Sequence, residues 1–531
     1  MADISLTPRW IPGGPQSHYL LYDLKFYKIT GKNEHKNQFS TALTPILMTL
    51  HRLKNRIDDM DHQNTWDEYK KITNPYEFVF LSLARRMQYS VAKKIPLSRS
   101  YYKMIEIWQN LNLADSIPKE FITAHSAEGP GGFIEAIVDI ATKTGYLLQG
   151  SLAMTLRSTD KNIPGWKKSQ TFLHKNPGVE ITYGKDNTGN LYNLENHTAF
   201  KEILATKSTG GKAHLYTADG GFDFTNDFNN QEENVIQLLL AEILLGLTVL
   251  EKGGVLIIKF FDTVLQPTLE MLYITTRHFR EWTITKPKTS RAANSERYLV
   301  CRGFLGVQED TVRIFSRALS PFKGKEGKNI LSFLDVRTHK EQEYLEFEKE
   351  IMYFQELFSK CQIEAITRTL TIIETKTNTI LQAQINENIT RSIEWCNRHN
   401  IEINEFYKDN SPEKQLAILT TELLTIGSLL PSRRSSHLLP GDGVRNSRIS
   451  DTTAQLFPSR RYLQEPFQPQ PRIDGVSAPP TPSSQTVQSI SGELLGHSPA
   501  LESWQITEET RSGNWEIVRR QQRGSWKGVP Q

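Results

Sequence analysis

Two lysines stand in largely apolar stretches, where an ammonium group needs a partner. Lys103 lies within "YYKMIEI" (residues 101–107), and Lys259 lies near the end of "VLIIKFF" (residues 255–261). Burying an unpaired charge is unfavourable, so each ammonium must reach water or meet an opposite charge. For Lys103 the first possibility stays open, because a lysine stem often lies along apolar surface while its ammonium stays solvated.

Two acids are the candidate partners of these lysines. Asp219 follows the β-rich run "AHLYTA" and precedes two glycines, and Glu296 stands in "NSERYLV" just before another β-rich run. The intervals from Asp219 to Lys259 and from Lys259 to Glu296 are each long enough for one helix-plus-strand unit. The two lysines and the two acids therefore need a common explanation.

A glycine-rich turn indicates a cofactor site. The β-like run "FITAH" leads into Gly129, Pro130, Gly131 and Gly132, and an apolar-periodic helix opens at Phe133. Glycines at such a turn let the backbone approach a ligand closely, and in open α/β sheets nucleotide-like cofactors bind at the carboxyl ends of the strands. The turn is neither GxGxxG nor a P-loop, so dinucleotides and nucleoside triphosphates fit it less well.

These residues belong to one of four regions that differ in composition. We expect an α/β fold in which residues 96–325 alternate short strands and helices, as in a parallel sheet with crossover helices. Residues 1–95 and 326–430 show helical periodicity and predict helical extensions on either side. Residues 431–531 are rich in Ser, Pro, Gln and Arg and predict a disordered tail.

The overall composition limits the protein class. The chain has 531 residues with 63 Lys+Arg against 59 Asp+Glu, which excludes a polycation but permits a local basic groove. Three widely separated cysteines cannot form a disulfide framework, which fits a reducing compartment. No signal peptide is visible, and the most apolar stretch, "VIQLLLAEILLGLTVL", is too short to span a bilayer and predicts a buried helix. We expect an intracellular protein, cytoplasmic or nuclear and not secreted, with no membrane partner.

Across residues 74–305 the chain resembles the FtsJ-like (RrmJ-type) RNA ribose 2′-O-methyltransferases. Within this family, its motifs most resemble those of the cap-specific mRNA methyltransferases of eukaryotes and large DNA viruses. The resemblance is carried by a Lys-Asp-Lys-Glu tetrad, matched in order by Lys103 in "SRSYYKMIEI", Asp219, Lys259 and Glu296. It implies a Rossmann-like sheet, S-adenosyl-L-methionine as cofactor, no metal, and RNA, in particular the capped 5′ end of mRNA, as substrate.

The resemblance also implies a role for each member of the tetrad. Lys259 would be the general base that takes the proton of the ribose 2′-hydroxyl, and Lys103 would orient the ribose and stabilise the developing alkoxide. A free lysine has a pKa near 10.4, so that of Lys259 must fall, and burial and the charge of Lys103 both act in that direction. Asp219 and Glu296 would hold the two lysines in register.

Further residues follow from the same resemblance. Gly129, Pro130, Gly131, Gly132 and Phe133 would contact the methionine end of the cofactor, Asp186 its adenine, and Asp219 would border it as well. Asp160 is a candidate for the cofactor's ribose, although the sequence departs from the family pattern there. In the insert that follows, Trp166 is a candidate for base stacking, and Lys167 and Lys168 are candidates for phosphate binding.

Three other interpretations remain open. The chain could be a catalytically inactive subunit of a capping or RNA-processing complex that binds the cofactor or RNA, although a scaffold has no need of two lysines in an apolar sheet. A nicotinamide-dependent oxidoreductase is disfavoured by the missing GxGxxG. An interaction protein could act through its tail, which holds Trp504, Trp515 and Trp526 and a phosphorylatable "RRSS" run at 433–436, so a protein partner for the tail is also expected.

Overall fold

The computed structural model describes residues 9–14, 20–28, 43–58, 63–81, 89–158, 163, 165–208, 210–221, 231–319, 328–375 and 377–427. All of these belong to one compact unit, Ser5–Pro431. The tail predicted for residues 431–531, with its three tryptophans and its "RRSS" run, lies outside the described residues.

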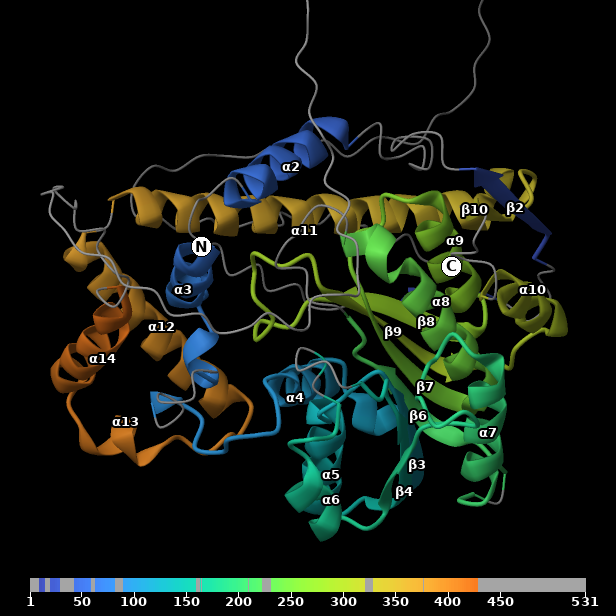
Figure 1. Ribbon diagram of the computed structural model, residues 1–531, viewed down its shortest axis with the longest axis horizontal. Helices are drawn as coiled ribbons and strands as arrows, with labels where there is room; N and C mark the ends of the chain where they lie inside the picture. Colours follow the sequence, from blue (N-terminus) through green and yellow to red (C-terminus); the bar gives the residue numbers. More distant parts are fainter. Residues whose placement is uncertain are drawn as a thin grey trace, which may run out of the picture. The chain divides into compact units, whose positions relative to one another are not determined.

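The centre of this unit is a mixed eight-stranded sheet with the strand order β1-β8-β9-β7-β6-β3-β4-β5 (Figure 1). Strands β5, β4, β3, β6 and β7 run parallel to one another, whereas β9 runs antiparallel to both β7 and β8, and β1 antiparallel to β8. Their bounds are β1 (Ile11–Pro12), β3 (Glu120–Ser126), β4 (Leu147–Met154), β5 (Val179–Thr182), β6 (Ala213–Ala218), β7 (Leu250–Phe260), β8 (Phe279–Thr285) and β9 (Arg297–Phe304).

The α/β class was predicted, but the sheet is not wholly parallel. Strands β8 and β9 are joined by residues 286–296, a stretch without a helix, so the chain turns back directly beside β8. A parallel neighbour would require a longer crossover connection. The antiparallel strand places Glu296, the residue before β9, beside the end of β7.

Helices cover both faces of the sheet. Along β7 the side chains of Val255 and Ile257 join one apolar core, and those of Leu256 and Ile258 join the other. Helices α4 (Ser100–Asn110) and α5 (Gly132–Thr144) pack in the first core, and α8 (Gln231–Val249) and α9 (Gln266–Thr276) in the second. Helix α8 is buried along nearly its whole length, as its apolar sequence predicted. Among the described residues no helix is both long and apolar enough to cross a membrane.

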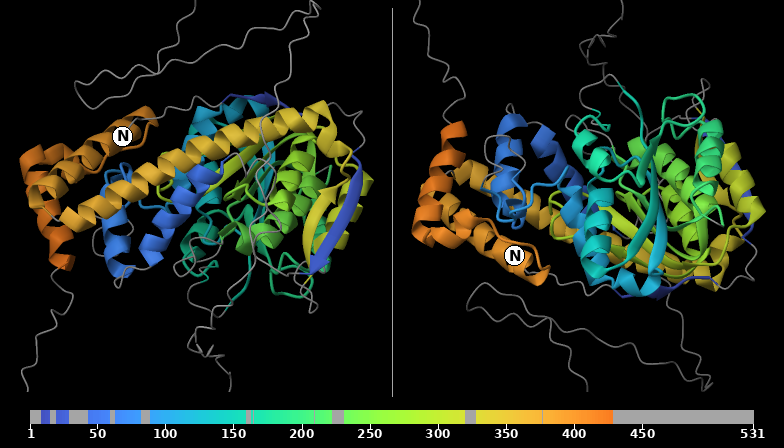
Figure 2. Two further views of the ribbon diagram at one scale, coloured as in Figure 1. Left: turned by 90° about the horizontal axis from the view of Figure 1, so that it is seen from above. Right: turned by 90° about the horizontal axis from the view of Figure 1, so that it is seen from below.

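The two extensions pack on one another and are not wholly helical. Strand β2 (Tyr22–Lys28) pairs with β10 (Lys328–Leu334) in a two-stranded sheet, and β1 extends the central sheet. Helix α11 packs against α2 and α3, and α12 packs against α3 and α14 (Figures 1 and 2). The helices of the extensions are α2 (Thr44–Asp58), α3 (Gln63–Thr73), α11 (Gln342–Thr375), α12 (Asn378–Arg398), α13 (Glu405–Asp409) and α14 (Pro412–Gly427).

The remaining helices connect strands or follow the sheet. They are α6 (Gln170–Lys175), α7 (Leu194–Ala205) and α10 (Glu309–Leu319), together with the single turns η1 (Glu77–Val79), η3 (Leu113–Ser116) and η4 (Thr338–Lys340).

Candidate active site

The register of three strands brings the predicted charged residues together. Ala218 of β6 pairs with Ile258 of β7, so Asp219 and Lys259 follow at the carboxyl ends of neighbouring parallel strands. Glu296 immediately precedes β9, which starts opposite the end of β7. Helix α4 packs against α5 and supplies Lys103 from its buried face. One helix and three strand ends therefore converge.

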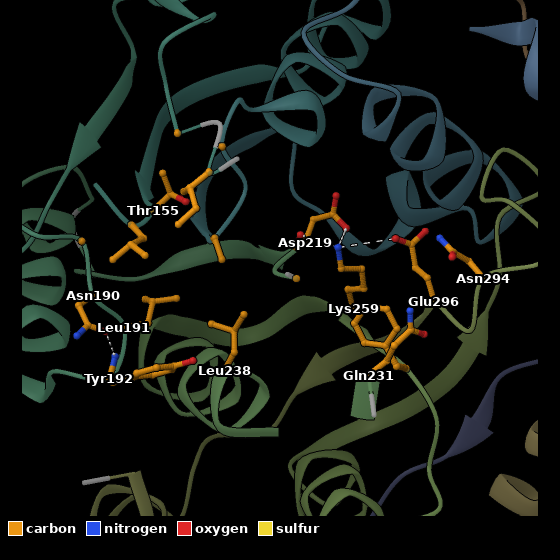
Figure 3. A pocket seen from close by; sticks show the side chains of 18 of the residues that line it. Thr155, Asn190, Leu191, Tyr192, Asp219, Gln231, Leu238, Lys259, Asn294 and Glu296 are labelled. Atoms are coloured by element: carbon orange, nitrogen blue, oxygen red, sulfur yellow. Dashed lines mark hydrogen bonds and ion pairs between the residues drawn. The ribbon is translucent and has the colours of Figure 1, made fainter. Parts of the chain in front are cut away.

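The four side chains form one cluster of ion pairs. The Nζ atom of Lys103 lies 2.7 Å from Oε1 of Glu296. The Nζ atom of Lys259 lies 3.1 Å from Oδ1 of Asp219 and 3.7 Å from Oε2 of Glu296, and it also donates a hydrogen bond to the Asp219 carbonyl at 2.9 Å. Figure 3 shows Asp219, Lys259 and Glu296 pointing toward one another. Lys103 is buried and paired, so its ammonium does not extend along the surface into water.

The two acids control the protonation of this cluster. Burial alone would raise the pKa of Glu296, but the charges of Lys103 and Lys259 outweigh it and hold that pKa well below its usual value. Burial likewise favours a lower pKa for Lys259, but Asp219 and Glu296 outweigh it and raise that pKa above its usual value. This differs from the expectation that burial and Lys103 would lower it. In the protein without ligands, Lys259 is therefore an ammonium at neutral pH.

Three hydroxyl groups that the sequence did not single out hold the acids. Tyr298 Oη donates to Oδ1 of Asp219 at 2.8 Å, and Ser100 Oγ donates to its Oδ2 at 2.5 Å. Ser290 Oγ donates to Oε1 of Glu296 at 2.7 Å. Ser100 lies three residues before Lys103 on the same helix, and Tyr298 lies two residues after Glu296. These short sequence spacings were the available signal, but without the fold they do not show that either hydroxyl group reaches Asp219.

The loop that carries Glu296 is anchored by a buried acid of α4. Glu106 accepts hydrogen bonds from the backbone N–H groups of Lys288 at 2.6 Å and Thr289 at 3.2 Å, and from Trp395 Nε1 at 3.2 Å. Lys103 and Glu106 lie three residues apart on α4. The helix that supplies Lys103 therefore also fixes the loop that supplies its partner.

The glycine-rich turn serves close packing as well as the cavity. Gly131 has φ +99° and caps the start of α5. A Cβ atom on Gly132 would lie 2.3 Å from Ser98 Oγ and 2.9 Å from the backbone nitrogen of Tyr101, so this glycine lets the start of α4 approach α5. Phe133 is fully buried, with its ring 5.7 Å from that of Tyr298.

A cavity of about 430 Å³ opens beside the charged cluster at the carboxyl ends of the parallel strands. One part is bordered by Gly129 after β3 and by Thr155 and Leu156 after β4. Another is bordered by Asn190, Leu191 and Tyr192, and a third by Asp219, Lys259 and Glu296 (Figure 3). Of the turn at 129–133, Gly129 borders the cavity, whereas Pro130, Gly131, Gly132 and Phe133 do not.

Asp186 lies behind one wall of the cavity and holds the loop that forms this wall through hydrogen bonds. Its carboxylate accepts hydrogen bonds from Thr188, Asn193 and Asn196, and those from Thr188 and Asn193 contribute most to lowering its pKa. Asp186 itself does not border the cavity, but its partners flank residues 190–192, which do. Asp160 lies outside the described residues.

Trp166 does not present a face for base stacking, which corrects that prediction. It is 4% exposed and packs with Ile134, Ala153 and Val179. Its ring also lies 2.9 Å from where a Cβ of Gly131 would be, so the indole fills the space that this glycine leaves. Lys167 and Lys168 are exposed.

The chain is similar in sequence to known methyltransferases. Residues 96–304 match the family model described as FtsJ-like methyltransferase. Cap-specific mRNA (nucleoside-2′-O-)-methyltransferase 1 of Dictyostelium discoideum is 27% identical over 351 residues, which cover 61% of this chain and 42% of that protein. The protein of the same name from Trypanosoma cruzi (strain CL Brener) is 34% identical over 204 residues, covering 38% of this chain and 53% of that protein. The chain thus spans about half the length of these curated relatives.

Proposed function

We propose that this chain, whose residues 96–304 form an FtsJ-like methyltransferase domain, transfers a methyl group from S-adenosyl-L-methionine to a ribose 2′-hydroxyl of RNA. The acceptor is a cap-proximal nucleotide of mRNA, the substrate class named for the curated relatives. The observation that carries the proposal is the cluster of Lys103, Asp219, Lys259 and Glu296 beside the cavity.

The cavity fits a cofactor of this size and charge. Its volume of about 430 Å³ lies within the range usual for small-molecule sites. Its border carries the carboxylates of Asp219 and Glu296 and the amide of Asn190, groups that suit a ligand with a positive charge and N–H donors. When bound, the cofactor supplies a methyl group on a positively charged sulfonium. Gly129 and Asp219 hold it directly, while residues 130–133 and Asp186 shape the loops around it.

Two lysines divide the work on the acceptor hydroxyl. Lys259, in its neutral form, accepts the 2′-hydroxyl proton as general base. Lys103 stays charged beside Glu296 and stabilises the oxygen as it becomes negative. Asp219 and Glu296 hold both amines in place, and a positively charged ligand in the cavity adds a repulsion that lowers the pKa of Lys259.

A catalytically inactive cofactor- or RNA-binding subunit is the second candidate. The raised pKa of Lys259 favours it, because a base that stays protonated cannot act. Against it stands the burial of two paired lysines. Replacing a buried ion pair by apolar residues of similar volume is often neutral or stabilising, so stability alone does not explain why the fold keeps these charges.

The deciding experiment is mass spectrometry of RNA after incubation with the protein and labelled S-adenosyl-L-methionine. We expect the label on a ribose of capped RNA and none on DNA of the same sequence, which lacks the 2′-hydroxyl. Label on a base, or label on DNA, would overturn the ribose assignment. Binding of the cofactor and RNA without any transfer would favour the inactive subunit.

A further inference from the structure

A second, smaller hollow adjoins the catalytic cavity on the side of the helical extensions. The two hollows share Lys70, Gln231 and Asn294 among the residues that border them. Lys70 lies on α3, which precedes the FtsJ-like range of residues 96–304. The wall of the catalytic cavity is therefore completed by a helix from outside that domain.

Most cations around the second hollow are held by buried acids of the fold. Arg291 Nη2 lies 2.7 Å from Oε1 of Glu77. Asp262 lies 3.5 Å from Lys54 and 3.0 Å from Arg297. Of these, Lys54 and Arg291 border the second hollow, and the charge of each is balanced inside the protein.

Lys70 is held much more loosely. Its partner is Asp67, one turn earlier on the same helix, and the two side chains are 20% and 38% exposed. A partly exposed pair within one helix turn contributes little to stability, and an ammonium has three donors of which Asp67 takes one.

We propose that Lys70 binds the backbone phosphate of the acceptor nucleotide, so that α3 forms part of the RNA-binding wall. This inference rests on the proposed function. A ribose within an RNA chain carries a phosphate on each side, so a ribose whose 2′-hydroxyl meets Lys259 places a phosphate near the border of the same cavity. A lysine binds phosphate as a point charge without strict geometry. Among the described residues that border this cavity, Lys70 is the cation that belongs neither to the charged cluster nor to a buried pair.

The test compares Lys70→Gln and Lys70→Arg with Lys360→Gln in the full chain. Lys360 is a matched control, an exposed lysine on α11 paired with Glu356 one turn earlier and bordering neither hollow. We expect Lys70→Gln to weaken binding of a short single-stranded RNA about tenfold at low salt and to reduce the slope of log affinity against log salt by about 0.7. Lys70→Arg should restore most of the affinity, and Lys360→Gln should change neither quantity.

Two further readouts separate this role from a structural one. Cofactor affinity should stay within about twofold of the parent in Lys70→Gln, and capped and uncapped RNA of one sequence should lose affinity equally. An unchanged RNA affinity and salt slope would overturn the assignment, as would a loss confined to capped RNA, which would place the contact at the cap. Absence of transfer to any RNA by the parent would overturn the proposed function instead, because RNA binding can still be titrated.

Discussion

To act as the proposed general base, Lys259 has to lose a proton that two carboxylates hold on it. Asp219 at 3.1 Å and Glu296 at 3.7 Å raise its pKa, and burial does not compensate. The same contacts fix the position of the amine, so the site combines good placement with an unfavourable protonation state. Substitution of Lys259 and the pH dependence of the rate test whether this lysine acts as a base despite its protonation state.

Substitution of Lys259 separates the base from the fold. Lys259→Met keeps the apolar stem and removes the amine, and loss of a positioned general base should lower single-turnover methyl transfer by a factor on the order of 10² to 10⁴. Lys259→Arg should be nearly as damaging, because a guanidinium stays protonated. Cofactor binding, measured by titration, should be nearly unchanged in both variants. An arginine variant within a few-fold of the parent would exclude Lys259 as the base.

The pH dependence follows from the direction of the pKa shift. A raised pKa means that only a small fraction of Lys259 is neutral at pH 7. As long as the pH stays below that pKa, each unit of increase in pH raises the neutral fraction about tenfold. We therefore expect the single-turnover rate to rise with pH from 6 to about 9, with a slope near one in log rate. A flat profile in a parent protein limited by chemistry would show that the amine is already neutral or is not the base.

The positions of individual site residues were predictable where the order of the strands alone determines them. Asp219 and Lys259 end neighbouring strands, so their meeting follows from the α/β pattern. Tyr298 and Ser100 were missed because their hydroxyl groups reach Asp219 only through the strand register and the angle of α4. Trp166 was misassigned because the sequence does not reveal that it fills the space beside Gly131.

Helix α4 and the loop 286–296 act as one assembly at the candidate active site. Glu106 of α4 binds the loop backbone, while Lys103 of the same helix binds Glu296 at the end of the loop. The strands and the buried α8 were predictable from apolar patterning. The antiparallel turn at 286–296 was not, because nothing in the sequence between β8 and β9 indicates whether the two strands run parallel or antiparallel. The position of α4 against α5 is the feature most open to test.

Gly132→Ala should disturb this helix contact. The added Cβ would lie 2.9 Å from the backbone nitrogen of Tyr101, so α4 must move, and Lys103 with it. Overpacking of this kind typically costs about 1 to 3 kcal/mol, and we expect a lower midpoint in chemical denaturation together with slower methyl transfer. Gly178→Ala is the control, since a Cβ there meets nothing within 4 Å and the glycine does not have positive φ. Equal behaviour of the two variants would contradict the packing argument.

The extensions contribute directly to the environment of the candidate active site. Gln355 of α11 accepts a hydrogen bond from Arg297 Nη1 at 3.0 Å, and Gln362 donates one to the carbonyl of Ala293 at 2.8 Å. Trp395 of α12 donates to Glu106, the anchor of the same loop. Helical periodicity predicted that these segments are helices, but their packing onto the loop depends on contacts between residues far apart in sequence.

These contacts predict opposite outcomes for two truncations. A chain ending at residue 430 keeps α11, α12 and α14, so it should transfer methyl groups to a short RNA within about twofold of the full chain. A chain ending at residue 325 loses the partners of Arg297, Ala293 and Glu106 and should lose most of its activity even where it folds. Single-turnover transfer checks both, with circular dichroism and cofactor titration to identify chains that fold. A folded 1–430 chain without activity would assign a catalytic contribution to residues 431–531, and a fully active 1–325 chain would show that α11 and α12 do not support the loop.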